Sequence, residues 1–172
     1  MRLSSNTITI FLFTLFTPVV FSTPTSDPGP ALSNAATFAA DWATIQQTLY
    51  LFSIAVDTKE YALLNDVFMP TATANFSTPS SQNISGLPAI TALLSKGLTG
   101  LTSQHSLTTL AVEFQSPTRA NSTQYLTTTF FGLGNLTGQV YVNYGSYKDR
   151  LELQNGGKWL VSHRDLVNLV SE

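Results

Sequence analysis

The sequence of 172 residues contains no cysteine and few charged residues, with 8 Lys or Arg and 10 Asp or Glu. The absence of cysteine excludes disulfides, thiolate metal sites and thiol nucleophiles. A formal net charge of −2 provides no basic surface for the phosphates of a nucleic acid. Hydrophobic residues make up 43% of the chain, which is the opposite of the composition of disordered proteins. We therefore expect a single folded domain with an apolar core.

The amino-terminal segment has the pattern of a secretory signal peptide. A short positive start at Arg2 precedes an apolar run over 8–21, which is too short to span a bilayer comfortably. Val20 and Ser22 are small enough for the signal peptidase pockets, so we expect residues 1–22 to be removed after Ser22. No later apolar run reaches membrane length. The sequence predicts a secreted, extracellular protein without a membrane segment after cleavage.

Four Asn-X-Ser/Thr sequons agree with passage through the secretory pathway, where they are acceptors for N-glycosylation. They lie at Asn75, Asn83, Asn121 and Asn135. We expect these residues to be the glycosylation sites of the protein.

Helices are predicted for the first part of the domain, which we place at 35–172 after a Pro-rich disordered leader at 23–34. Apolar residues recur every three or four positions between Phe38 and Val56, which predicts one long helix. Residues 57–60 (DTKE) then read as a capping box for a short second helix. A third helix is expected to start near Pro88.

The period changes from 3.6 to 2 after residue 100. Strands are expected there at 105–115, 122–133, 139–154 and 158–169, in addition to a short strand at 71–76 before the third helix. Helices followed by an antiparallel meander predict an α+β domain in which a curved sheet covers three amino-terminal helices. In the last hairpin, a three-residue loop at 155–157 sets Leu153 opposite Trp159. The same register places Asp149 opposite His163 on the inward face, as expected for a pocket at the end of the sheet.

Several motifs together resemble the SnoaL-like families of the nuclear transport factor two-like superfamily, which includes scytalone dehydratase and ketosteroid isomerase. The resemblance covers about residues 35–170. The motifs occur in the family order and are Asp57-Thr-Lys-Glu60, Phe68-Met-Pro-Thr-Ala-Thr-Ala74, Ser103-Gln-His105, Gly145-Ser-Tyr147-Lys-Asp149 and Lys158-Trp159-Leu-Val-Ser-His-Arg164. The resemblance implies a cone-shaped α+β barrel with an apolar cavity at its open end. It also implies acid/base chemistry that uses neither a metal nor a cofactor.

The residues themselves also favour proton transfer over other chemistry. The chain has two histidines, with no adjacent carboxylates at a spacing typical of a zinc site. It contains no G-x-S-x-G elbow, P-loop or dinucleotide-binding glycine pattern.

Four residues are the candidate catalytic groups. Asp57 matches the aspartate at the end of the first helix in the dehydratase branch, although it also fits the role of a helix N-cap. His105 matches the catalytic histidine of that branch, and an ordinary histidine titrates near neutral pH. Tyr147 is expected to donate a hydrogen bond to a substrate oxygen. Asp149 is expected to be a base or to orient His163, with a structural pair to His163 or Arg164 as the alternative.

The remaining pocket is expected to be mostly apolar. Its predicted lining is Trp42, Phe52, Phe68, Phe76, Leu107, Thr129, Phe131 and His163. The chain departs from the dehydratase pattern, because the second pocket histidine falls near Thr129 and Phe130, and Val56 and Phe76 replace two tyrosines. These departures argue against dehydration of the scytalone type.

Two functions remain. The first is a secreted cyclase, isomerase or dehydratase that acts on a small apolar, oxygenated molecule such as a polyketide or terpenoid. The alternative is a secreted small-molecule binding protein that uses the same cavity without turnover. The resemblance also implies a homodimer through the outer face of the sheet, which glycans at Asn121 or Asn135 would oppose.

Overall fold

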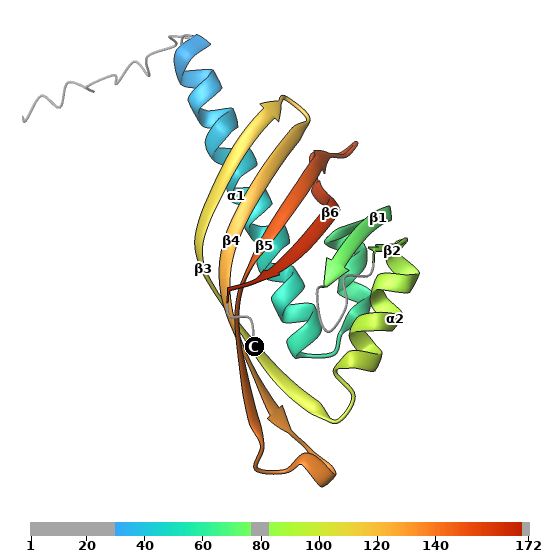
Figure 1. Ribbon diagram of the computed structural model, residues 1–172. Helices are drawn as coiled ribbons and strands as arrows, with labels where there is room; N and C mark the ends of the chain where they lie inside the picture. The colour runs from blue at the N-terminus through green and yellow to red at the C-terminus, as the bar shows by residue number, and fades with distance from the viewer. Residues whose placement is uncertain (1–29, 77–82, 170–172) are drawn as a thin grey trace, which may run out of the picture.

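The computed structural model describes residues 30–76 and 83–169 (Figure 1). The expected signal peptide lies outside the described residues, as do residues 23–29 of the expected leader. The first helix begins at Pro30, within the range expected for that leader.

Helices precede most of the strands, as the sequence predicts. The elements are α1 (Pro30–Asp57), the 3-10 helix η1 (Tyr61–Asp66), β1 (Phe68–Phe76), β2 (Asn83–Ser85), α2 (Leu87–Gly97), β3 (Leu101–Ser116), β4 (Arg119–Gly132), the 3-10 helix η2 (Gly134–Leu136), β5 (Val140–Leu153) and β6 (Trp159–Asn168). The strands form one sheet in the order β2-β1-β6-β5-β4-β3. Among the described strands only the β1–β6 pair is parallel, and the sheet curves over α1 (Figure 1). The predicted α+β fold is confirmed, while the short edge strand β2 was not predicted.

The core lies between the concave face of the sheet and one stripe of α1. Ile45, Leu49, Phe52 and Val56 follow one another at helical spacing and are at most 1% exposed. The helix is also tied to β6 by a hydrogen bond, because Thr48 Oγ1 donates to the Trp159 carbonyl at 2.8 Å. Apolar burial and this polar contact fix the carboxyl-terminal end of α1 against the sheet.

The capping box expected at 57–60 is wrong. Asp57 is the last residue of α1, and η1 starts after Glu60 without any side-chain cap. The chain turns instead at Lys59, which has a positive φ of 65°. The Asp57 carboxylate is therefore not used for capping, and it points to β3.

The last hairpin follows the predicted register only near its loop. Leu153 pairs with Trp159 and Leu151 pairs with Val161, as expected. Beyond them the register shifts, because β6 carries an extra residue, Ser162, so that Arg150 pairs with His163. Since neighbouring strand residues point to opposite faces, this bulge reverses the predicted faces of the β6 residues beyond it, while Asp149 on β5 keeps its predicted inward face.

The outer face of the sheet exposes apolar side chains toward the η2 end. Phe131, Val140, Val142 and Tyr144 are between 41% and 56% exposed, and the β4–β5 register places them side by side. The homodimer expected through this face stays a prediction. Within the described residues, no helix combines the length and apolar character needed to cross a membrane.

Candidate functional site

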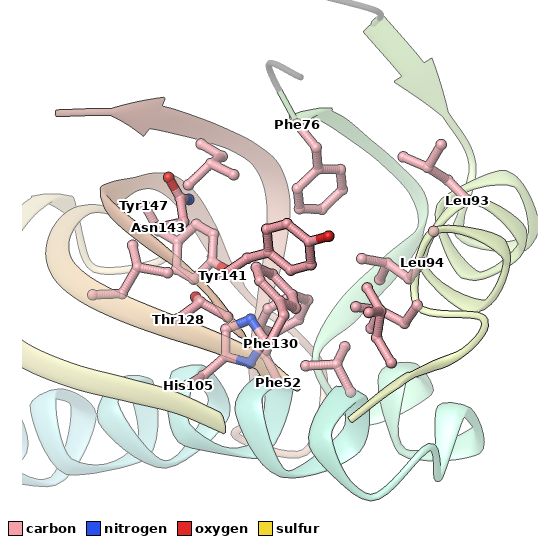
Figure 2. A pocket seen from close by; sticks show the side chains of 16 residues that line it. Phe52, Phe76, Leu93, Leu94, His105, Thr128, Phe130, Tyr141, Asn143 and Tyr147 are labelled. Atoms are coloured by element: carbon pink, nitrogen blue, oxygen red, sulfur yellow. The ribbon is translucent and has the colours of Figure 1, made fainter. Parts of the chain in front are cut away.

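A cavity of about 320 Å³ opens between α2, the end of α1 and the concave face of the sheet (Figure 2). Its lining is mostly apolar and comes from both helices and from five strands: Phe52, Val56, Phe76, Leu93, Leu94, Gly97, Leu98, Leu101, His105, Leu126, Thr128, Phe130, Tyr141, Asn143, Tyr147 and Leu166. The size and the mixture of apolar walls with a few polar groups are typical of small-molecule sites.

His105 on β3 and Asp57 at the end of α1 form a hydrogen-bonded pair at the wall of this cavity. The ring Nδ1 lies 2.7 Å from Asp57 Oδ1, and the His105 backbone N–H donates to Asp57 Oδ2 at 2.8 Å. Ser103 Oγ also donates to Asp57 Oδ1 at 2.7 Å. Three donors from β3 thus converge on one carboxylate and fix the histidine ring.

This geometry assigns the proton on the His105 ring. A carboxylate can only accept, so the neutral ring carries its proton on Nδ1 and leaves Nε2 as an acceptor. Nε2 makes no hydrogen bond with the described residues, and Figure 2 shows the ring among the side chains that line the cavity. Nε2 is therefore the ring nitrogen that a bound molecule can reach.

The pKa of the Asp57 carboxyl lies below its ordinary value. Burial is the largest single influence and would raise the pKa. The hydrogen bonds from the side chain and backbone of His105 and from Ser103, with the His105 charge, together outweigh it. Asp57 consequently stays ionised at neutral pH and is suited to stabilise a protonated His105.

Two further polar side chains stand in line with His105 across the sheet. Thr128 on β4 pairs with His105, and Asn143 on β5 pairs with Thr128. Directly paired residues have Cβ atoms about 4.5–5.5 Å apart, so the three side chains form a continuous polar row on the cavity wall. The Asn143 amide also donates to Asn168 Oδ1 at 3.3 Å. Sequence reasoning missed both Thr128 and Asn143.

Tyr147 on β5 lies deeper in the cavity and is 3% exposed. Its ring packs edge-on against Phe52, with the ring centroids 5.4 Å apart. Burial is the main reason that the pKa of its hydroxyl is raised above the ordinary value. Tyr147 therefore stays protonated at physiological pH and can act as a hydrogen-bond donor, while its expected contact with a substrate oxygen stays a prediction.

A protein-family model matches most of this domain, including the candidate catalytic residues. The model of the SnoaL-like domain matches residues 37–165, which include Asp57, His105 and Tyr147. The chain belongs to the SnoaL-like domain family. No curated protein matches the sequence of this SnoaL-like chain.

Solved structures share the fold of this SnoaL-like protein at low sequence identity. A candidate scytalone dehydratase from Novosphingobium aromaticivorans is 18% identical with a TM-score of 0.70, over 79% of this chain and 89% of that one. The hexachlorocyclohexane dehydrochlorinase LinA-type3 from Novosphingobium barchaimii is 17% identical with a TM-score of 0.69, over 79% and 91%. ActVI-ORFA from Streptomyces coelicolor is 16% identical with a TM-score of 0.63, over 74% and 96%.

Asp149 does not line the cavity of this SnoaL-like domain. It pairs with Arg164 rather than with His163, and both side chains are fully buried. Arg164 Nε and Nη2 donate to the two carboxylate oxygens, each at 2.7 Å. The expected contact between Asp149 and His163 is wrong because of the bulge at Ser162, and the structural pair with Arg164 that sequence reasoning left open is the arrangement found.

His163 lies on the opposite face of the sheet from the cavity. Its Nδ1 is 2.7 Å from Thr73 Oγ1 on β1, and its Nε2 is 2.9 Å from Asp165 Oδ2. It borders a separate polar groove on the outer face, together with Lys148 and Arg150. His163 is therefore not a residue of the substrate pocket, contrary to the prediction.

The other predicted lining residues divide into three groups. Phe52 and Phe76 line the cavity. Phe68 is buried in the core behind Phe52, while Trp42 and Leu107 are partly buried outside the lining. The prediction for Thr129 and Phe131 is wrong, because they alternate with the inward Thr128 and Phe130 and point to the outer face. Sequence reasoning could not assign the faces of this strand, since Phe130 and Phe131 are adjacent and equally apolar.

The sequon residues differ in exposure. Asn83, Asn121 and Asn135 are exposed, whereas Asn75 is partly buried on β1 directly opposite Asn83. Their glycosylation stays a prediction. In the part of the chain that the structure describes, no three His, Asp or Glu side chains come together as a metal site.

Proposed function

We propose that this SnoaL-like protein is an acid/base lyase or isomerase that acts on a small, neutral, apolar molecule with an oxygen function. The observation that carries the proposal is the Asp57–His105 pair, which presents His105 Nε2 to an otherwise largely apolar cavity. A positioned histidine that accepts or donates a proton in the transition state typically contributes about 10²–10⁴-fold to a rate.

In the proposed reaction His105 Nε2 takes a proton from a carbon or hydroxyl of the substrate. The negatively charged Asp57, 2.7 Å from Nδ1, stabilises the imidazolium that forms. The electron pair released from the broken bond moves toward the substrate oxygen, to which the Tyr147 hydroxyl donates a hydrogen bond in this proposal. Return of the proton from His105 to another atom completes an isomerisation, and its delivery to a departing hydroxyl completes a dehydration.

The charges around the cavity support a neutral substrate. Among the described lining residues, His105 is the only side chain other than tyrosine that ionises. The polar row of His105, Thr128 and Asn143 lies on the sheet side, while leucines of α2 line the opposite side. Such an arrangement suits a molecule with oxygen atoms on one edge and a hydrocarbon body, the class to which polyketides and terpenoids belong.

The names of two structural relatives support elimination as the reaction class. One is described as a candidate dehydratase and another as a dehydrochlorinase, and both names denote removal of a small molecule from a substrate. We also propose that the protein acts outside the cell, on the basis of the signal-like segment 1–22 and the four sequons. Amino-terminal sequencing of protein recovered from the medium of an expressing culture tests this localisation.

The reaction can be tested with a compound that the protein itself carries through purification. The purified mature protein is denatured, its extract is analysed by mass spectrometry, and any recovered compound is incubated with the wild type, Asp57→Asn and His105→Ala. We expect the wild type to convert the compound and both variants to be at least about 100-fold slower. Conversion that both variants retain in full would disprove the acid/base role. Binding without conversion would favour the alternative function, a carrier.

A further inference from the structure

A layer of polar side chains lies inside the domain beneath the cavity. It consists of Ser122 and Gln124 on β4, Asp149 on β5 and Arg164 on β6, which we call the polar layer. These four residues are between 0% and 5% exposed. None of the four lines the cavity, and Ser122 and Asp149 also border the polar groove that His163 borders.

The sheet register brings the members of the polar layer together. Ser122 pairs with Asp149, and Asp149 pairs with Arg164, so these three stand in one row across β4, β5 and β6. Gln124 lies two residues from Ser122 on the same face, opposite Tyr147. The row thus lies directly next to a residue that lines the cavity.

Most members of the polar layer have polar atoms without a partner. Seven buried side-chain nitrogen or oxygen atoms in the described residues have no hydrogen bond, and four of them belong to this layer: Ser122 Oγ, Gln124 Nε2, Gln124 Oε1 and Arg164 Nη1. Buried polar groups in folded proteins almost always have a partner, because an unsatisfied one is costly. A cluster of four such atoms therefore points to a bound partner.

The chemistry of the orphaned atoms identifies that partner. Arg164 Nη1 and Gln124 Nε2 are donors, Gln124 Oε1 is an acceptor, and the Ser122 hydroxyl is both. Asp149 already neutralises Arg164 through two hydrogen bonds of 2.7 Å, so the layer has no net charge to attract an ion. Water both donates and accepts, and buried waters typically make about three hydrogen bonds to such groups.

We propose that the polar layer is a binding site for ordered internal water, held by Arg164 Nη1, Gln124 and Ser122. The carbon at the centre of the Arg164 guanidinium lies 4.1 Å from the centre of the Tyr147 ring and 4.3 Å from that of Phe52. Asp149 holds two of the three guanidinium nitrogens, and the water holds the third. The guanidinium is thereby fixed as a platform behind two side chains that line the cavity.

A high-resolution crystal structure of the full chain tests the water site directly. We expect an ordered water within hydrogen-bond distance of Arg164 Nη1 and of the Gln124 amide or Ser122 Oγ. A structure in which Gln124 bonds directly to Arg164, with no water density in the layer, would overturn the proposal.

The stability of Gln124→Met provides a second test, because Met has nearly the same shape without hydrogen-bonding groups. If water bridges the layer, the variant loses its hydrogen bonds and the Tm falls by about 2–4 °C. If the layer is dry, removal of two orphaned polar atoms leaves the Tm unchanged or raises it, which would reject the proposal. The matched control is Gln104→Met at an exposed position of β3, for which we expect no such fall. Neither test depends on the proposed catalytic function.

Discussion

The described residues contain two Asp–His pairs, which use different ring nitrogens and have different surroundings. In the first, His105 Nδ1 lies 2.7 Å from Asp57, and Nε2 has no partner in the described residues. In the second, His163 bonds Thr73 through Nδ1 and Asp165 through Nε2, so both ring nitrogens are engaged. The first ring lines the cavity, and the second lies on the outer face of the sheet.

The difference shows that a histidine beside an aspartate is not by itself a sign of catalysis. An acid/base role requires a free ring nitrogen that a substrate can reach. Of the two pairs, only Asp57–His105 provides one. His163 instead joins β6 to the neighbouring β1 through its hydrogen bond with Thr73 and thereby stabilises the sheet. Substitutions at the two pairs should therefore affect different properties.

The largest expected difference is in turnover. His105→Gln removes the proposed base and should lower turnover of a compound recovered from the protein by about 10²–10⁴-fold. His163→Gln, the matched control, should leave turnover close to the wild-type value. The measurement is product formation by mass spectrometry on equal amounts of folded enzyme, and equal losses in both variants would remove the distinction between the two pairs.

The second prediction concerns Asp149 and Asp165, two carboxylates that do not line the cavity. Asp149→Asn leaves the buried Arg164 without its counter-charge and should cost about 3–5 kcal/mol of unfolding free energy. Asp165→Asn acts on a side chain that is 38% exposed and should cost at most about 1 kcal/mol. Urea unfolding of both variants provides the comparison. A similar cost at the two positions would show that burial of the Asp149–Arg164 pair does not control its contribution.

A smaller effect is expected in the acid stability of Asp57. Because its pKa in the folded protein is lowered, Asp57 stabilises the fold above its ordinary pKa of 3.8, and this stabilisation is lost as the pH falls through the folded value. Asp57→Asn should cost about 1–2 kcal/mol at neutral pH and show a shallower decline in acid. Thermal unfolding of both proteins, measured from neutral to acid pH, gives the dependence of stability on pH. If the wild type and Asp57→Asn lost stability equally in acid, the lowered pKa would be contradicted.

The smallest effect is expected for Thr73→Val, which removes only the hydrogen bond to His163 Nδ1. The cost should be about 0.5–1.5 kcal/mol of unfolding free energy, without a change in turnover. A loss of turnover in this variant would mean that the outer pair communicates with the cavity, and it would weaken the contrast between the two histidines.

Much of the fold could be predicted from local sequence patterns. The apolar stripe of α1, the alternation in β3 to β6 and the Asn-Gly-Gly loop place the elements within a few residues. The association of Asp57 with His105 was expected only through the family resemblance, because the two lie 48 residues apart and no local pattern joins them.

Register was the main source of error at the site. If β3 and β4 paired regularly from the Ser116–Arg119 pair onward, His105 would lie opposite Phe130. Two irregularities in β3 shift the pairing so that His105 faces Thr128 instead. The bulge at Ser162 likewise moves His163 away from Asp149. Bulges insert single residues at positions that alternation does not reveal, so the polar row with Thr128 and Asn143 could be found only in three dimensions.

The central claim is that Asp57 holds the proton of His105 on Nδ1 and leaves Nε2 as the base that faces the cavity. Nitrogen-15 NMR of the imidazole rings at mildly alkaline pH, where histidine is ordinarily neutral, reads this proton directly. His105→Gln and His163→Gln assign the two sets of signals. We expect His105 to be protonated on Nδ1, with an unprotonated Nε2. A His105 ring that carries its proton on Nε2 would contradict the proposed base.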